Sequence, residues 1–180
     1  MTDQHRFLSA GHFDEDLYAN SRTGERVLNA AIVQADISLS FEDYLEIFNT
    51  FYADDIEVSS DTAEESIRGK DRVRVLLLNF LVPLHVMAEV GGLSMSIRES
   101  PIPGDTANET HSIWTLELVG VSGKTCTLSW RTFRKWNGAH VVYEHHYDQQ
   151  QTGGPLTSDD LSLDVADPID GFRGPSKAAS

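Results

Sequence analysis

Cysteine is nearly absent from this chain: its 180 residues include one, Cys126, which excludes an internal disulfide and predicts a reduced thiol buried in a strand. Basic residues are also scarce, because 14 Lys and Arg stand against 28 Asp and Glu, for a net charge of -14. A surface of that sign repels nucleic acid phosphates and anionic membranes, so we expect neither as a partner. No apolar run reaches the roughly 18 residues of a membrane span, and the polar start of the chain does not resemble a secretory signal. These absences predict a soluble cytoplasmic protein.

The apolar content, 40% of 180 residues, is enough for one core of ordinary size. Residues 1–23 mix polar and aromatic side chains without a sustained period and are predicted to form an N-terminal arm. Residues 24–150 carry the periodic patterns of a single domain. Residues 151–180 hold three of the six prolines and are predicted to be an acidic, Pro- and Gly-containing tail, which either stays apart from the domain or docks on it.

The order of the predicted elements indicates the fold class. Apolar residues recur at helical spacing over 27–35, 41–52 and 73–81, which predicts three helices. A period of two then predicts strands over 93–98 and 110–119, before a final hairpin. Helices grouped ahead of an antiparallel meander favour an α+β domain with the helices packed on one face of the sheet.

The final hairpin allows its register to be predicted. Asn137 and Gly138 lie between two β-rich runs, which indicates a two-residue type I′ turn. That turn predicts the following cross-strand pairs: Trp136 with Ala139, Thr132 with Tyr143, Trp130 with His145, Leu128 with Tyr147, and Arg131 with Glu144. We therefore expect His145 in an aromatic wall on one face, and His146 on the other face with an ion pair between Arg131 and Glu144.

Three stretches carry a resemblance to a known family: Phe51-Tyr-Ala-Asp-Asp-Ile-Glu-Val58, Ile67-Arg-Gly-Lys-Asp71, and the hairpin over 133–148. Their order and spacing resemble the NTF2-like superfamily, and more narrowly its SnoaL-like branch, which includes polyketide cyclases and lies near ketosteroid isomerases, limonene epoxide hydrolases and scytalone dehydratases. The resemblance covers roughly residues 25–150. It implies a cystatin-like cone, a curved antiparallel sheet wrapped on the N-terminal helices, with an apolar pocket open at one end and often a homodimer through the outer face of the sheet.

The resemblance also implies a catalytic position. In epoxide hydrolases of the superfamily the last strand reads Trp-Arg-Asp-Tyr-Phe-Asp, and its first aspartate faces the pocket as an acid or base. Aligned on that strand, Tyr143 to Asp148 places His145 at this position. A histidine can exchange a proton near neutral pH, so His145 is the first candidate for catalysis. The alternative is a core histidine bonded to backbone or to a tyrosine hydroxyl.

The strand over 110–119 adds either His111 or Trp114 to that face, since a one-residue slip exchanges them. Alternation favours Trp114, which shares its parity with Leu116 and Leu118. His111 is kept as a candidate catalytic partner, with an ordinary polar sheet residue as the alternative. The expected wall of the substrate pocket consists of Trp114, Trp130, Tyr143 and Tyr147.

Tyr52 and Asp54 end the second predicted helix, ahead of a short strand over 56–58. Dehydratases of the superfamily use early-helix Tyr and Asp residues beside their histidines, so the resemblance makes Tyr52 a candidate for substrate binding and Asp54 for catalysis. The alternatives are a core aromatic and a carboxylate that binds local backbone N–H groups. No pair of histidines has metal-ligand spacing on a helix, and we predict neither a metal nor a cofactor.

These patterns predict a SnoaL-like small-molecule enzyme that binds an apolar, oxygenated ligand. It would move a proton through His145 in an isomerisation, cyclisation or dehydration. The alternative is a non-catalytic module whose cone binds a ligand or serves only to dimerise. An apolar cavity containing His145 and a second polar group is expected of the enzyme, and a narrow, filled cone of the module.

Overall fold

The computed structural model describes residues 21–38, 41–78, 92–120 and 122–154. Its elements are α1 (Ser21–Ser38), α2 (Phe41–Phe51), β1 (Tyr52–Ser60), β2 (Ile67–Arg68), a helical segment over 70–78, β3 (Gly92–Glu99), β4 (Glu109–Val119), β5 (Thr125–Asn137) and β6 (His140–Gly153). The predicted arm and tail, and any docking of the tail, fall largely or wholly outside the described residues.

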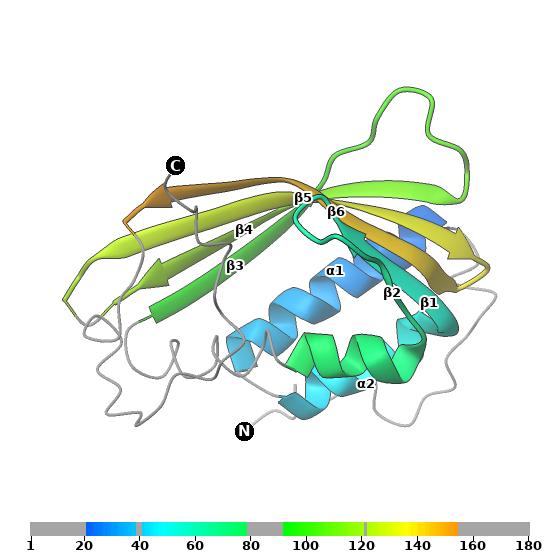
Figure 1. Ribbon diagram of the computed structural model, residues 1–180, viewed down its shortest axis with the longest axis horizontal. Helices are drawn as coiled ribbons and strands as arrows, with labels where there is room; N and C mark the ends of the chain where they lie inside the picture. Colours follow the sequence, from blue (N-terminus) through cyan, green and yellow to red (C-terminus); the bar gives the residue numbers. More distant parts are fainter. Residues whose placement is uncertain (1–20, 39–40, 79–91, 121, 155–180) are drawn as a thin grey trace, which may run out of the picture.

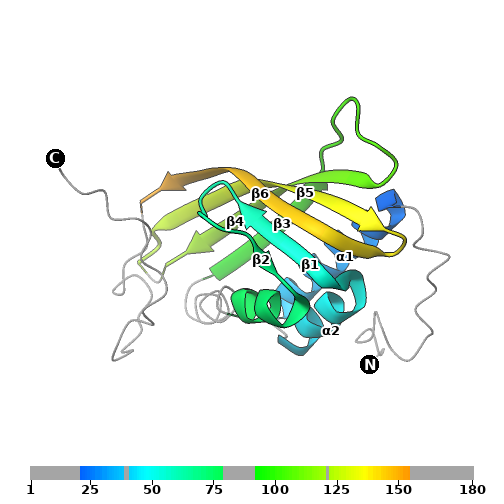
Figure 2. The ribbon, with the colours of Figure 1, turned by 45° about the vertical axis from the view of Figure 1, so that its right-hand side comes forward.

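The six strands form one sheet in the order β2-β1-β6-β5-β4-β3. Strands β3 to β6 make the predicted antiparallel meander, and β1 joins its edge in parallel to β6, a parallel pair that the sequence did not indicate. The helices lie together on one side of this twisted sheet (Figures 1 and 2). The expected α+β class, a curved sheet over N-terminal helices, is therefore confirmed.

The core lies between the helices and the face of the sheet that is turned toward them, called here the inner face. Alternate residues of each strand point to that face, as a half-buried sheet requires. Its buried apolar side chains are Met95, Trp114, Leu116, Leu118, Cys126, Trp136 and Val141, and the helices add Leu28, Ala31, Ile32, Ala35, Ile47, Phe48 and Phe51. Cys126 is a free, buried thiol.

The end of the second helix differs from the prediction. Helix α2 stops at Phe51, and Tyr52 is the first residue of β1, so Asp54 and Asp55 lie in a strand and do not close a helix. Tyr52 is nevertheless buried and stacks on Phe48, with ring centroids 4.9 Å apart. The last turn of α2 and the first residue of β1 face the same core, and this continuity made the apolar spacing look helical throughout.

The predicted register of the final hairpin is wrong. The turn residues are Gly138 and Ala139, with Asn137 paired to His140, and only Gly138 has a positive φ, 59°, which is the pattern of a type II′ turn. This change moves the pairing by two residues and leaves the faces as predicted. Between Lys135 and Trp136, however, the register shifts again.

A β-bulge at Val142 causes that second shift, because Trp136 pairs with Val141 and Lys135 with Tyr143. An odd shift exchanges the two faces of every residue beyond it. His145 therefore lies opposite Phe133 and not Trp130, and His146 lies opposite Thr132 on the inner face. A second bulge follows at Asp148, whose φ is 53°.

The side chains of β4 are divided between the same two faces of the sheet. Trp114 pairs with Trp130 on the inner face, whereas His111 pairs with Phe133 on the opposite side, called here the outer face. His111, and not Trp114, thus shares a face with His145, so the expectation drawn from alternation along β4 is also corrected. Residues 100–108, which join β3 to β4, stand up from the sheet on its outer side (Figure 1).

Candidate functional site

A buried guanidinium occupies the middle of the inner face. Arg134 is fully buried on β5, and two carboxylates bind it from opposite sides. Its Nη1 donates to Oε1 of Glu25, from α1, at 2.8 Å, and its Nε donates to Oε2 of Glu144, from β6, at 2.6 Å. Burying such ions costs free energy that their mutual attraction repays only with good geometry and further hydrogen bonds.

Glu25 receives those further bonds. Its Oε1 accepts from Ser112 at 2.5 Å and from Asn29 at 3.0 Å, and its Oε2 accepts from Thr110 at 2.9 Å. Burial opposes the ionised form of Glu25, but Arg134 and these donors outweigh it, and the pKa of Glu25 is lowered from its ordinary value. The carboxylate stays charged inside the protein.

Glu144 is held in the same way. Tyr52 Oη donates to its Oε2 at 2.7 Å, and the Nε2 of His146 lies 3.0 Å from its Oε1. Burial again opposes the charge of Glu144, but Arg134 and His146 outweigh it and hold the pKa of Glu144 far below the ordinary value. Burial raises the pKa of Tyr52 well above its ordinary value, although Arg134 opposes this, so the phenol keeps its proton and remains a donor.

The hydrogen-bond partners of His146 fix its tautomer. Glu144, as a carboxylate, can only accept, so Nε2 of His146 carries a hydrogen and Nδ1 accepts from Thr132 Oγ1 at 3.2 Å. The His146 side chain is 25% exposed, whereas Thr132 is fully buried. The two carboxylates and one guanidinium leave these three buried ionised groups with one negative charge in excess.

Apolar rings border this network. Trp114 and Trp130 stack with centroids 5.5 Å apart, and the guanidinium of Arg134 lies 5.4 Å from the centroid of the Trp114 ring. Beyond them the inner face carries partly buried apolar side chains, namely Leu93, Ile97 and Leu128. In Figure 1 the ends of β3 to β6 extend beyond α1, so this part of the inner face lies outside the cover of the described helices.

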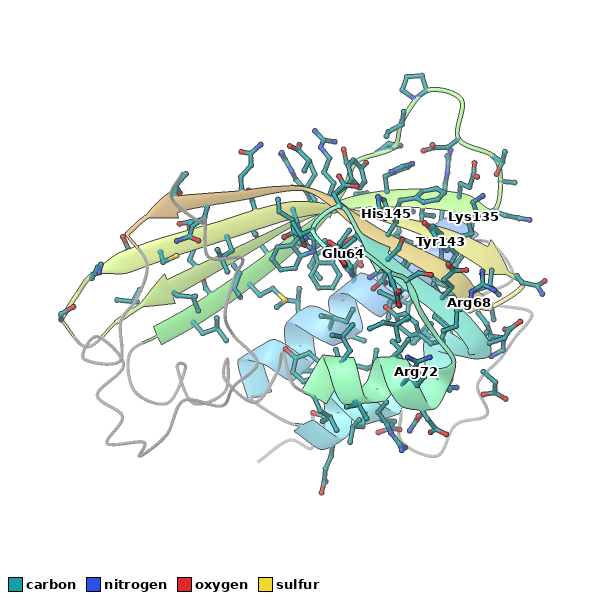
Figure 3. All side chains as sticks on the ribbon, viewed as in Figure 1. Glu64, Arg68, Arg72, Lys135, Tyr143 and His145 are labelled. Atoms are coloured by element: carbon teal, nitrogen blue, oxygen red, sulfur yellow. The ribbon has the colours of Figure 1, made fainter. Side chains whose placement is uncertain are left out.

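The outer face holds the predicted histidine, because His145 lies opposite Phe133; Figure 3 labels His145 and Tyr143 on β6. His145 Nδ1 lies 2.8 Å from Ser59 Oγ, and its Nε2 lies 3.1 Å from Asp61 Oδ1. Its ring stacks between Tyr143 and Tyr147, with centroids 6.4 and 5.8 Å away. The aromatic wall thus exists, but without Trp130.

His111 forms a second such group on the outer face. Its Nε2 lies 3.1 Å from Asp105, in the loop over 100–108, and its Nδ1 lies 3.1 Å from Tyr147 Oη. Its ring packs on Phe133 with centroids 4.8 Å apart. Asp105 can only accept, so Nε2 of His111 donates to it, and the bonds of His111 to Asp105 and Tyr147 connect the loop to the sheet.

The structure divides the predicted site residues among three places. Tyr52, Trp114 and Trp130 lie on or beside the inner face, and His145, His111, Tyr143 and Tyr147 lie on the outer face. Asp54 is almost wholly exposed beside Lys70, in an open hollow of about 300 Å³ that Tyr52 also borders. Tyr52 thus lies between the inner-face group and the hollow around Asp54, while the four outer-face residues are on the opposite side of the sheet. The catalytic roles remain predictions.

Sequence reasoning missed Glu25, Arg134 and His146. The predicted ion pair between Arg131 and Glu144 is also wrong, since Arg131 binds Asp148 at 3.3 Å and Glu144 binds Arg134. The sequence did contain one indication of this ion pair, the opposite charges of Arg134 and Glu144. The two residues become direct cross-strand partners when the bulge is included in the register.

Two negative findings concern the described part of the chain alone. Within it, no group of three or more His, Cys, Asp or Glu side chains is arranged to hold a metal ion. No helix among the described residues combines the length and the apolar character needed to cross a membrane.

Comparison with known proteins gives matches to solved structures. No protein-family model and no curated protein matches the chain. An NTF2-like protein of unknown function from Cytophaga hutchinsonii is 13% identical, over 67% of this chain and 97% of its own, with a TM-score of 0.42. A Bacillus subtilis protein provisionally named an isomerase is 11% identical, over 76% and 89%, with a TM-score of 0.49. A Jannaschia protein provisionally named a SnoaL-like polyketide cyclase is 8% identical, over 71% and 85%, with a TM-score of 0.48.

These similarities are too distant to bear on activity, and the fold rests on the architecture itself. Helices α1 and α2 precede the first strand, the four-stranded meander β3 to β6 curves over them, and β1 joins the sheet beside β6 with β2 at its edge. The fold is that of an NTF2-like cone.

Proposed function

We propose that this protein is a small-molecule enzyme of the SnoaL-like type that moves a proton with His146. The observation that carries the proposal is the arrangement of His146: a partly exposed imidazole on the inner face, oriented by Glu144, which a fully buried guanidinium holds in turn. A general base needs such orientation by a third group, and buried ionisable groups with shifted pKa values gather at functional sites. The proposed base, His146, is therefore the sequence neighbour of His145, the base predicted from the sequence.

Each member of the network has a separate task in this proposal. Nδ1 of His146 takes the proton, and the hydroxyl of Thr132 turns from donor to acceptor as it does so. Nε2–H of His146 stays bonded to Glu144, whose negative charge stabilises the imidazolium. Arg134 keeps Glu144 ionised, and it acts as a positioning residue because it does not reach the substrate.

The ligand class follows from the surroundings of His146. Trp130 lies two residues before Thr132 on the same face of β5, and partly buried Leu128 continues this apolar wall. Ligand sites of this kind are mostly apolar with a few placed polar groups. We therefore propose an apolar substrate with an oxygen function beside the labile C–H bond, for isomerisation, cyclisation or dehydration by groups that the chain itself supplies.

A non-catalytic module is the second candidate, and one observation favours it. Arg134, Thr132 and Ser112 are fully buried, so the polar network fills its part of the cone. Under this candidate the network fixes the packing of α1 on the sheet, and the aromatic outer face serves to pair two copies of the chain.

Deuterium exchange separates the two candidates. The protein is incubated in deuterated buffer with 2-tetralone or 5-androstene-3,17-dione, apolar ketones with labile C–H bonds, and exchange is followed by NMR. The protein is expected to accelerate deuterium exchange of the ketone. His146→Gln is expected to lower the exchange rate at least tenfold, since general base catalysis contributes roughly 10²–10⁴-fold.

His140→Gln makes the same change at the turn of the hairpin and is the matched control. A rate equal to buffer alone for the unaltered protein, or equal rates for the His146 variant and the unaltered protein, contradicts the proposal.

A further inference from the structure

The outer face carries a continuous chain of hydrogen bonds that runs from Asp61 through His145 and Ser59 to Tyr143. Ser59 Oγ lies 2.8 Å from His145 Nδ1 and 2.8 Å from Tyr143 Oη, and His145 Nε2 lies 3.1 Å from Asp61 Oδ1. Strands β1 and β6 position these groups, because Ser59 and His145 are direct partners in the parallel pair.

In the neutral form of His145, which a general base requires, the directions of these bonds follow from Asp61. Its carboxylate can only accept, so the ring hydrogen lies on Nε2 and Nδ1 accepts. Ser59 must then donate its hydroxyl hydrogen to His145, and Tyr143 donates to Ser59. Serine, imidazole and carboxylate are thus arranged as nucleophile, base and orienting acid, which is the relation that activates a serine.

Exposure distinguishes this serine from its counterpart on the inner face. Thr132 bonds His146 in the same way but is fully buried, whereas Ser59 is only half-buried. The side chains of His145 and Asp61 are 28% and 60% exposed. A small electrophile can therefore approach Ser59 from the outer side of the sheet without unfolding any element.

We propose that Ser59 is a nucleophile for acyl transfer from small aryl esters, with His145 as its base and Asp61 as a positioning residue. Tyr143 Oη lies 2.8 Å from Ser59 Oγ and supplies a hydrogen bond to the oxyanion that forms on the ester carbonyl. The aromatic rings of Tyr143 and Tyr147, on either side of His145, favour an aryl over an alkyl leaving group.

The reaction runs in two balanced halves. Ser59 Oγ forms a bond to the carbonyl carbon while its proton passes to His145 Nδ1, and the ester C–O bond then breaks as His145 returns that proton to the departing phenoxide. Water next attacks the acyl-serine, gives a proton to His145, and the carboxylic acid leaves as Ser59 regains its proton. No oxidant, reductant or metal enters either half.

A fluorophosphonate probe tests the nucleophile directly, with the labelled residue identified by peptide mass spectrometry. Ser59 is expected to be labelled, and His145→Gln to lower the rate at least tenfold. Asp61→Asn should lower it and Asp61→Glu restore part of it, which a merely structural carboxylate would not do. With p-nitrophenyl acetate the protein should release a burst of about one p-nitrophenolate per chain, the kinetic sign of an acyl-enzyme. Ser129→Ala, a matched change on the outer face of β5, is the control.

Ser59→Cys keeps the proposal testable if removal of the hydroxyl disturbs folding. Its thiol is expected to react with iodoacetamide at pH 6 at least tenfold faster than that of Ser129→Cys, and His145→Gln should abolish the difference. Failure of the probe to label Ser59, or labelling at the same rate without His145, overturns the proposal. Equal alkylation rates for the two cysteine variants overturn it as well.

Discussion

The two faces of the sheet carry the same chemical group in different surroundings. His145 and His146 are adjacent in sequence, and each joins a carboxylate to a hydroxyl: Asp61 and Ser59 on the outer face, Glu144 and Thr132 on the inner face. On the inner face the carboxylate is itself bound to a buried guanidinium, and its pKa is displaced far from the ordinary value. Burial and the further partners of the carboxylate, more than the arrangement of carboxylate, imidazole and hydroxyl itself, therefore distinguish the electrostatics of the two groups.

The largest expected difference between the faces concerns their arginines. Arg134→Met leaves two buried carboxylates without their cation and is expected to lower the free energy of unfolding by about 3–5 kcal/mol. Arg131→Met removes a guanidinium whose bond to Asp148 is partly exposed to solvent, and about 0–1 kcal/mol is expected. Urea denaturation at pH 7 measures both variants, and equal losses would remove the distinction between the faces.

The pH dependence of the free energy of unfolding provides a second test of the difference between the faces. The pKa values of Glu25 and Glu144 are lower in the folded protein than in the unfolded chain. Their contribution to stability is therefore complete above the unfolded value, about 4.3, and is lost progressively as the pH falls toward the folded values. Urea denaturation from pH 7 to pH 3 should show unfolding free energy declining below about pH 4.5. Glu144→Gln is expected to flatten this decline, and a variant that declines as steeply as the unaltered protein would contradict the role of Glu144.

Two tyrosines give the smallest and most closely matched comparison. Tyr52→Phe removes a buried donor to the charged Glu144 and is expected to cost about 1.5–3 kcal/mol. Tyr147→Phe removes a half-exposed donor to His111, and a loss below about 1 kcal/mol is expected. Thermal unfolding of both variants measures these losses of stability, and circular dichroism shows whether each variant keeps the fold. A larger loss for Tyr147→Phe would reverse the assignment of the faces.

Periodicity predicted most of the elements, because burial on one face imposes a spacing that the sequence shows directly. The helix over 27–35 and the strand from Leu93 lie within observed elements for this reason. The parallel pairing of β1 with β6 joins segments far apart in the chain, and no local pattern records it. The boundary at Tyr52 was missed because a helix and a strand share one core there.

The buried network could not be predicted for a different reason. Arg134 alternates with Phe133 and Lys135, so either face was compatible with it until the register was known. Glu25 lies in a helix that the sequence places more than 100 residues away, and Asn29 and Ser112 complete the group from two more positions. Only tertiary packing shows that these polar side chains point at one another. His145 was expected beside Trp130 because the type I′ turn was carried along the whole hairpin without a bulge, and the resemblance to the superfamily's last strand made it the catalytic candidate.

The bulge at Val142 also determines how this hairpin tolerates the loss or gain of a residue in β6. Val142 is the extra residue between two regular pairs, so a chain that lost it would still pair Trp136 with Val141 and Lys135 with Tyr143. The positions beyond the bulge would keep their faces, whereas loss of a residue from the regular ladder would reverse them. A deletion at this one position therefore leaves His145 and His146 on the faces that they occupy now.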